Sequence, residues 1–234
     1  MSSILLDHHN KLGDNIICNG LVREYCKRYD RVGIFCIPRY YISVSFMYRD
    51  LENLVLETSM NHRDKQISRF LNRFTLGEKH YDKIKILYDD TELGIPAERQ
   101  FYALAGVPHE KKWSSFYVER NRAQELNFFD KVAPEAPYIF IHDDAVYGSR
   151  MQPQKLPSHL KAVRAQIDLT DNIFDYCTVL ERAEEIHVVD SVFMFLVDCL
   201  PYQNPAQKLF VHRYARSNPP WRLPILKKDW AILE

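Results

Sequence analysis

The chain has 234 residues, of which 46% are hydrophobic and 26% charged, the composition of an ordinary globular protein with a sizeable core. Its 31 Lys and Arg residues balance 31 Asp and Glu residues, so it lacks the basic surplus of a general nucleic-acid binder, and nucleic acid is not an expected partner. Only 7 glycines and the absence of a low-complexity tract exclude fibrous and disordered classes.

Cysteine usage and the apolar runs indicate the compartment. The 5 cysteines are widely spaced, form no Cys-x-x-Cys pair and lie mostly among apolar neighbours, as is typical of reduced, buried thiols. The first nine residues are too few and too polar for a signal peptide, and the longest apolar run, 192–197, is far below the ~20 residues of a membrane span. We therefore expect a cytoplasmic protein without a transmembrane segment.

The first half of the chain alternates short apolar runs with helix-length segments. The runs predicted as buried strands are 4–6, 32–37, 54–56 and 84–88, and the segments predicted as helices are 16–29, 40–50 and 62–73. Residues 97–131 are charged and aromatic, and we predict helices there with a break at 106–108. Strands separated by helices indicate βαβ units and a parallel sheet.

A second series begins after the prolines at 134–137. Strands are predicted at 138–142, 186–190 and 209–212, helices at 171–185 and 191–200, and a Pro-rich tail follows. We expect an α/β fold of two Rossmann-like parallel-sheet halves that face a cleft, with domains 1–131 and 132–234. Ligands of such folds bind at the loops that follow the carboxyl ends of the strands.

The first strand-to-helix turn is dense in polar residues. It contains neither Gly-x-Gly-x-x-Gly nor a phosphate loop with Gly-Lys-Ser/Thr. Its candidate site residues are His8, His9, Asn10, Lys11, Gly13 and Asp14. Asp14 is expected at the helix N-terminus, where it serves either as an N-cap or as a functional carboxylate. The number of polar neighbours favours the functional interpretation, because a buried turn does not need them.

Two further groups of polar residues lie in the second half. Asp190 and Ser191 are expected where a strand meets a helix N-terminus, which suits an anionic phosphate, although either could simply cap the helix. His187, on the preceding strand, is interpreted as a core histidine. Arg213 and Arg216 follow the last predicted strand, where guanidinium groups can bind a diphosphate; a solvated basic tail is the alternative.

Paired acidic residues raise the question of a metal. His142-Asp143-Asp144 and Asp89-Asp90 both follow predicted strands, and adjacent carboxylates there could hold Mg²⁺ or Mn²⁺. Neither group offers a complete ligand set, and paired aspartates commonly form turns. We therefore predict no metal site.

Three of these segments, in this order along the chain, resemble motifs of GT-B-type glycosyltransferases, in particular the ADP-heptose heptosyltransferase group. Gly13-Asp14 resembles the Gly-Asp pair that opens the first helix in that family. Lys155-Leu156-Pro157 is similar to its Lys-x-Trp-Pro segment. Asp190-Ser191 is similar to the start of its Asp-Thr-Gly-x-x-His segment, with Val192 and Phe195 in place of the glycine and the histidine.

The resemblance implies a glycosyltransferase that moves a sugar from a nucleotide-diphosphate donor to an acceptor hydroxyl, on a glycan or another molecule. It implies Asp14 as the base, and we expect His8 or His9 to assist it. The acceptor is expected on the first half, near Asn10, Lys11 and Gly13. The donor is expected on the second half, at Lys155, Asp190, Ser191, Arg213 and Arg216. A single displacement gives inversion, and no metal or cofactor is expected if cationic groups neutralise the leaving diphosphate.

Two alternatives remain open at this point. One is a metal-dependent hydrolase or phosphotransferase that uses His142, Asp143 and Asp144. The other is a non-catalytic Rossmann-like binding module.

Overall fold

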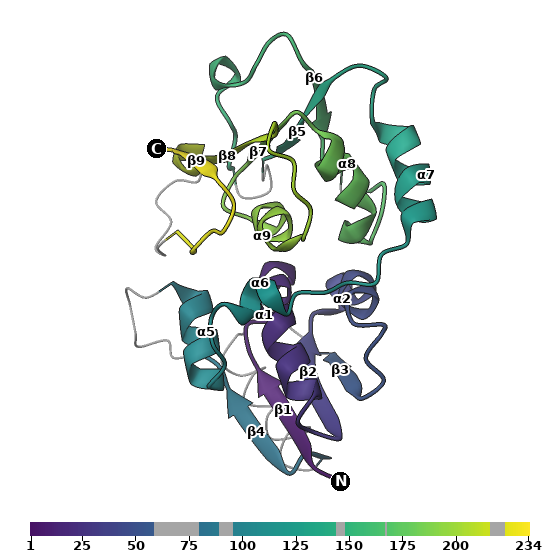
Figure 1. Ribbon diagram of the computed structural model, residues 1–234, viewed down its shortest axis with the longest axis vertical. Helices are drawn as coiled ribbons and strands as arrows, with labels where there is room; N and C mark the ends of the chain where they lie inside the picture. Colours follow the sequence, from purple (N-terminus) through teal and green to yellow (C-terminus); the bar gives the residue numbers. More distant parts are fainter. Residues whose placement is uncertain (59–79, 89–95, 144–147, 167, 216–222) are drawn as a thin grey trace. The chain divides into compact units, whose positions relative to one another are not determined.

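The computed structural model describes residues 1–58, 80–88, 96–143, 148–166, 168–215 and 223–234. It divides into two compact units, Met1–Glu119 and Arg120–Glu234 (Figure 1). The sequence places the division near residue 132, at the prolines. In the structure, helix α7 (Arg122–Val132) belongs to the second unit, where it packs against η5 (Ile173–Tyr176) and α8 (Cys177–Arg182).

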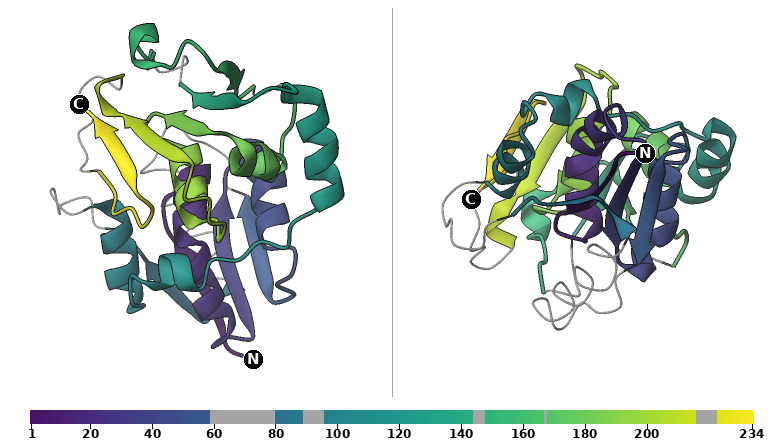
Figure 2. Two further views of the ribbon diagram at one scale, coloured as in Figure 1. Left: turned by 45° about the horizontal axis from the view of Figure 1, so that its top comes forward. Right: turned by 90° about the horizontal axis from the view of Figure 1, so that it is seen from below.

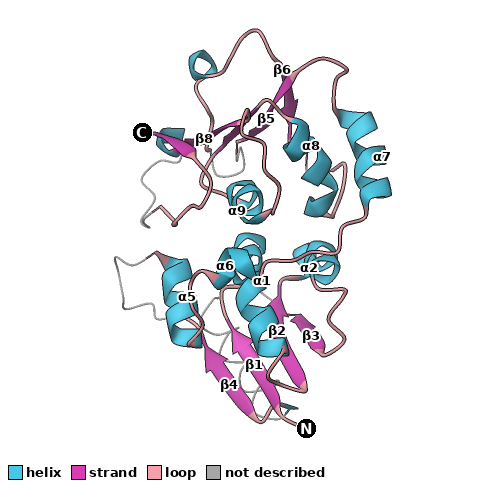
Figure 3. Ribbon diagram, viewed as in Figure 1, coloured by secondary structure: helices cyan, strands magenta, loops and turns pink. Residues whose placement is uncertain are grey.

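The first unit contains a parallel sheet of four strands in the order β3-β2-β1-β4 (Figure 3). Its strands are β1 (Ser3–Asp7), β2 (Arg31–Cys36), β3 (Leu54–Thr58) and β4 (Lys83–Ile86). Its helices are α1 (Leu12–Cys26), η1 (Pro38–Tyr40), α2 (Tyr41–Met47), α5 (Ala97–Ala105) and α6 (Lys111–Ser114). Helix α5 ends at Gly106, which has φ 64°, a left-handed conformation that glycine adopts without strain.

The second unit contains a parallel sheet of five strands in the order β6-β5-β7-β8-β9 (Figure 2). Its strands are β5 (Tyr138–His142), β6 (Lys161–Arg164), β7 (Glu185–Val188), β8 (Lys208–His212) and β9 (Trp230–Leu233). Besides α7, η5 and α8 it contains η4 (Pro153–Lys155), α9 (Val192–Cys199) and η6 (Arg213–Ala215).

The central strands are apolar because they are covered on both faces. Leu5 and Ile34 in the first sheet and Ile186 and Val211 in the second are fully buried. All five cysteines are free thiols, and four of them are buried. Within the described residues, no helix combines the length and the apolar character needed to cross a membrane.

Gly20 lies where two helices of the first unit pack against each other. A Cβ atom built at this position would lie 1.9 Å from the carbonyl oxygen of Lys111, the first residue of α6. The absence of a side chain therefore allows α1 and α6 to approach closely. The contact joins two helices of the first unit.

One predicted helix differs from the observed elements, and two observed strands were not predicted. The helix expected over 171–185 is the 3₁₀ turn η5 followed by the short helix α8, because Ala183 already has extended ψ 139°. Strand β6 has only Val163 buried among its four residues, so it shows no apolar run. Strand β9 lies in the tail that we expected to be irregular, at the edge of the sheet. The helix expected over 62–73 lies outside the described residues.

Candidate functional site

Each sheet has one position where the order of its strands reverses. In the first unit the chain builds β2 and β3 on one side of β1 and then places β4 on the other side. In the second unit it builds β6 on one side of β5 and then β7, β8 and β9 on the other. In parallel α/β sheets ligands bind outside the carboxyl ends of the two strands that flank such a switch point. The candidate ligand-binding positions are therefore the carboxyl ends of β1 and β4, called the first edge, and the carboxyl ends of β5 and β7, called the second edge.

The first edge holds the predicted histidines. The ring of His9 lies 5.3 Å from that of Tyr88, which follows β4, and 5.2 Å from that of Phe101 on α5. The Tyr88 hydroxyl donates a hydrogen bond of 3.2 Å to the buried carboxylate of Asp7, the last residue of β1. Asp7 was not predicted as a site residue, although its position directly before two histidines at a strand end is a signal for it.

His8 and His9 differ in accessibility. His8 is fully buried, and its Nδ1 atom donates to the carbonyl oxygen of His9. His9 is half-buried, as are the neighbouring candidates Asn10, Lys11 and Gly13. His8 therefore has a structural role within the turn, and His9 is the histidine of the pair that a ligand can reach.

Asp14 is not the N-cap of α1. The helix begins at Leu12 and its N-cap residue is Lys11, whose side chain makes no capping hydrogen bond. Asp14 is the third residue of the helix and is half-buried, and its negative charge interacts favourably with the helix dipole. The capping interpretation is therefore wrong, and the carboxylate lies in the first turn of α1, which follows the carboxyl end of β1.

At the second edge, a histidine and a serine from neighbouring strand ends are joined. Nδ1 of His142, the last residue of β5, lies 2.8 Å from Oγ of Ser191, which follows β7. Ser191 occupies the N-cap position of α9, but its hydroxyl makes no capping hydrogen bond. Asp190 beside it is buried. The first backbone N–H groups of α9 thus lie next to a hydroxyl at this edge, an arrangement that suits an anion.

The groups considered for a metal have other partners. Oδ1 of Asp143 forms an ion pair of 2.9 Å with Nη1 of Arg164, and His142 is hydrogen-bonded to Ser191. Across the parts of the chain that the structure describes, no three His, Cys, Asp or Glu side chains gather in a way that could hold a metal ion. Asp144, Asp89 and Asp90 lie outside the described residues.

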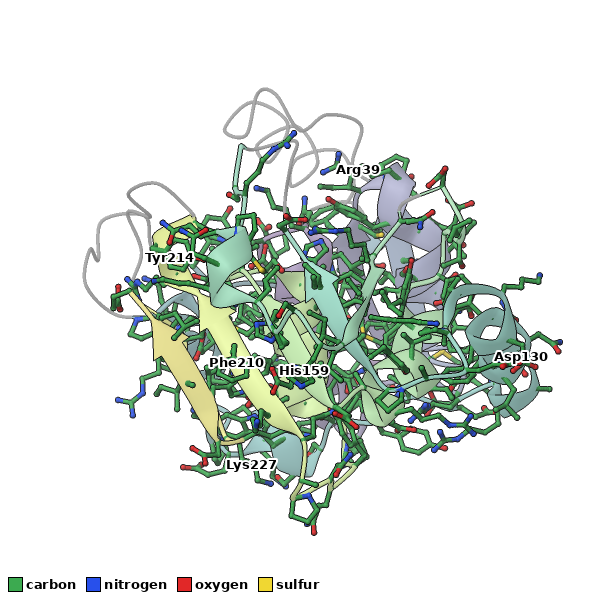
Figure 4. All side chains as sticks on the ribbon, turned by 90° about the horizontal axis from the view of Figure 1, so that it is seen from above. Arg39, Asp130, His159, Phe210, Tyr214 and Lys227 are labelled. Atoms are coloured by element: carbon green, nitrogen blue, oxygen red, sulfur yellow. The ribbon has the colours of Figure 1, made fainter. Side chains whose placement is uncertain are left out.

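The predicted cations of the second unit lie on short 3₁₀ turns. Lys155 ends η4 and is exposed, and its Nζ atom lies 4.0 Å from the centre of the Tyr214 ring. Arg213 begins η6, directly after β8, and its Nε atom lies 3.9 Å from a carboxylate oxygen of Glu234. Figure 4 labels Tyr214, which follows β8, and Phe210, in the middle of that strand. Arg216 lies outside the described residues.

The tail is packed rather than solvated where the structure describes it. Asp198 on α9 accepts hydrogen bonds from the backbone amides of Lys227 and Lys228, at 2.8 and 3.0 Å, and from the indole of Trp230 at 3.2 Å. Burial lowers the pKa of the Lys228 ammonium to about 8. These contacts hold the segment that leads into β9.

A series of hydrogen-bonded side chains, most of them buried, connects strands β7 and β8 to Tyr214. His187, expected as a core histidine, is indeed buried, but it joins Glu185 on its own strand to His212 on β8, and His212 contacts the Tyr214 hydroxyl. Polar residues two apart on adjacent predicted strands were the available signal, because such residues share one face of a sheet.

Comparison with protein-family models finds no match, and neither does comparison with curated proteins. Solved structures do match. A family 9 glycosyl transferase from Veillonella parvula has a TM-score of 0.61 at 11% identity, over 99% of this chain and 86% of that one. The ADP-heptose LPS heptosyltransferase II of E. coli has a TM-score of 0.59 at 12% identity, over 100% and 90%.

A third structure, the iron-containing dodecameric glycosyltransferase TibC of E. coli H10407, has a TM-score of 0.53 at 9% identity and covers 90% of this chain and 58% of its own. These likenesses confirm the expected α/β fold class with two Rossmann-like parallel-sheet halves of GT-B type.

Proposed function

We propose that this protein is a glycosyltransferase of carbohydrate biosynthesis that transfers a sugar from a nucleotide-diphosphate donor to an acceptor hydroxyl. One observation carries the proposal. Two of the polar groups singled out in the sequence, His8 to Asp14 and Asp190 with Ser191, follow strands that flank the switch points of the two parallel sheets, in a fold shared with solved glycosyltransferases.

The second unit binds the donor. Lys155 and Arg213 supply positive charge near the carboxyl ends of the strands, and Ser191 with the first amides of α9 supplies hydrogen-bond donors. A diphosphate needs both, because its charge must be neutralised and its oxygens need hydrogen bonds. Asp190, buried beside Ser191, positions this turn.

The first unit binds the acceptor and supplies the base. The Asp14 carboxylate removes the proton of the acceptor hydroxyl, and the resulting oxygen attacks the anomeric carbon of the donor. The bond between that carbon and the diphosphate oxygen breaks, and the nucleoside diphosphate leaves with the electron pair. His9 orients the acceptor, together with Asn10 and Lys11. A single displacement inverts the configuration at the anomeric carbon.

The charge that develops on the leaving diphosphate is stabilised by Lys155, Arg213 and the N-terminus of α9, which makes a metal unnecessary. The rival hydrolase is less favoured, because Asp143 is paired with Arg164 and His142 with Ser191.

Calorimetry and thermal shift with ADP, GDP, UDP, CMP and dTDP, and with their sugars, test the proposal. A nucleotide present at 100 times its dissociation constant should stabilise the folded protein by about 2.7 kcal/mol. The nucleotide that binds is then tested for sugar release with candidate acceptors. If a nucleotide sugar binds but is never turned over, the protein is a binding module; if none binds, the donor site is refuted.

A further inference from the structure

Four side chains of the second unit form one continuous hydrogen-bonded chain. Oε2 of Glu185 lies 3.1 Å from Nε2 of His187, and Nδ1 of His187 lies 2.8 Å from Nε2 of His212. Nδ1 of His212 then lies 2.9 Å from the hydroxyl oxygen of Tyr214. Glu185, His187 and His212 are buried, and Tyr214 is half-buried.

Both ends of the chain are anchored. At one end Oε1 of Glu185 accepts a hydrogen bond of 3.0 Å from the ammonium group of Lys208. At the other, the backbone amide of Gln152 donates to the Tyr214 hydroxyl at 3.0 Å, and Lys155 lies over the face of the same ring. The chain therefore ends on the segment that carries the proposed diphosphate-binding lysine.

The carboxylate fixes the direction of every bond. A carboxylate only accepts, so Nε2 of His187 carries its proton and Nδ1 of a neutral ring is bare. That bare nitrogen accepts from Nε2 of His212, whose own Nδ1 is then bare and accepts from the Tyr214 O–H. With its proton directed inward, the Tyr214 oxygen presents a lone pair to the Gln152 amide.

The surroundings keep this pattern in place at neutral pH. Burial lowers the pKa of His187, and burial together with His187 and Lys155 lowers the pKa of His212 to about 4. Burial alone would raise the pKa of Glu185, but hydrogen bonds from Lys208 and His187 outweigh it and leave that pKa below its ordinary value. Both rings are thus neutral and the carboxylate is charged. The ring of His187 is also held by stacking on Phe210, at 4.6 Å.

We propose that Tyr214 is a positioning residue of the donor site, and that the Glu185–His187–His212 chain sets its hydroxyl so that Lys155 and the Gln152 amide are held together for the diphosphate. This rests on the proposed function, since the ligand is the nucleotide diphosphate of the donor. The ring holds the ammonium by a cation–π contact, and the hydroxyl holds the backbone before it.

The first experiment needs no ligand. Long-range ¹H–¹⁵N NMR of the histidine rings at pH 7.5 should show His187 and His212 both as neutral Nε2–H tautomers. In Glu185→Gln an amide replaces the carboxylate and can present either its oxygen or its NH₂ group to His187, so both tautomers should appear in each ring. Glu184→Gln, an exposed neighbour that loses the same charge, should keep the original spectrum. If either ring of the unaltered protein is an Nδ1–H tautomer or is charged, the proposed direction of the hydrogen bonds from Glu185 to Tyr214 is refuted.

The second experiment measures ADP, GDP and UDP affinity by calorimetry. Tyr214→Phe keeps the ring under Lys155 and removes the hydroxyl, so the affinity should fall about 3- to 10-fold, the value of one hydrogen bond. Glu185→Gln should weaken binding in the same direction, and Glu184→Gln should not. Absence of nucleotide binding in the unaltered protein would refute the proposed function. Undiminished binding in both Tyr214→Phe and Glu185→Gln would refute the positioning role alone.

Discussion

His142 and Ser191, 49 residues apart in the sequence, are joined by a hydrogen bond of 2.8 Å between Nδ1 and Oγ. The sequence assigns them to rival functions, His142 to a metal site and Ser191 to phosphate binding. They meet because β5 and β7 are adjacent parallel strands, whose carboxyl ends share one edge of the sheet. The histidine therefore supports the proposed anion site and holds the hydroxyl of Ser191 away from a capping position.

The cations of the second unit provide the first prediction. Lys155→Ala and Arg213→Ala should each weaken nucleotide-diphosphate binding by about 1.5–3 kcal/mol, the range of charge-assisted hydrogen bonds. Calorimetry measures this loss. Lys161→Ala is the matched control, since Lys161 is an exposed lysine of the same unit on β6. Unchanged affinity in both variants would place the donor elsewhere.

The second prediction concerns metals. Transfer activity should persist in excess EDTA, because in the proposed mechanism Lys155, Arg213 and the α9 N-terminus neutralise the leaving group. Activity is measured before and after chelation, with Mg²⁺ and Mn²⁺ added back. Strict dependence on either ion would refute this mechanism, and Arg164→Ala, which frees Asp143 from its ion pair, would then be examined for altered metal affinity.

The buried histidines predict how stability varies with pH. Because the pKa of His212 is about 4 in the folded protein and about 6.5 in the unfolded chain, the unfolded chain binds more protons between these values. This contribution is complete above about pH 6.5 and is lost as the pH falls toward 4. His187 acts in the same direction. The free energy of unfolding should fall by up to about 1.4 kcal/mol per pH unit for each histidine.

Urea denaturation at pH 7.5 and pH 5.0 measures this slope. His212→Gln should reduce it, whatever its effect on stability at pH 7.5. The control is His159→Gln, which removes an exposed histidine of the same unit (Figure 4) and should leave the slope unchanged. An equal slope in all three proteins would contradict the assignment.

The sequence predicts the parts of the fold whose signal is local. Buried parallel strands such as β2 and β5 read as continuous apolar runs, so their positions agree with the structure within a residue or so. Strand β6 shows no such run, because three of its four residues are exposed at the sheet edge. Strand β9 is a short apolar run at the other edge of the sheet, and it follows a Pro-rich segment that indicated an irregular tail. Their formation depends on pairing with distant strands, which no local pattern records.

The candidate site follows the same rule. Asp190 and Ser191 are candidates because they follow a strong strand, and strand ends in parallel sheets bind ligands. For the hydrogen-bonded series from Glu185 to Tyr214, the two-residue spacing indicates a shared sheet face, but the contact of His187 with His212 depends on the register that places His187 opposite Phe210 on β8. The Asp14 cap was misassigned because helix α1 begins earlier, at Leu12, than its apolar pattern indicates.

Two glycines provide a contrasting pair for stability. Gly20→Ala would place a Cβ atom 1.9 Å from the Lys111 carbonyl oxygen, a backbone atom that moves only if α6 shifts. The free energy of unfolding should therefore fall by about 3 kcal/mol, the upper end of the usual range for overpacked cores. Gly106→Ala meets no atom within 4 Å and should cost only the left-handed conformation, about 1–2 kcal/mol. Chemical denaturation measures both. A smaller loss for Gly20→Ala than for Gly106→Ala would contradict the close approach of α1 and α6.

The last prediction separates catalysis from stability at Asp14. Because this residue is the third of helix α1 and not its cap, its charge stabilises the helix through the helix dipole. Asp14→Asn removes that charge with little change in shape, so the free energy of unfolding should fall by about 0.3–1 kcal/mol.

As the general base, however, the carboxylate cannot be replaced by an amide, which accepts no proton. Transfer by Asp14→Asn should therefore fall by roughly 10²–10⁴-fold, while the nucleotide affinity should stay unchanged because the proposed donor site lies on the second unit. Glu98→Gln is not a suitable control, since Glu98 is buried in an ion pair with Lys112. Asp30→Asn is suitable, because Asp30 lies in the turn before β2, at the opposite end of the sheet from the first edge. Full turnover in Asp14→Asn with an identified donor and acceptor would exclude Asp14 as the base, and the search would move to His9.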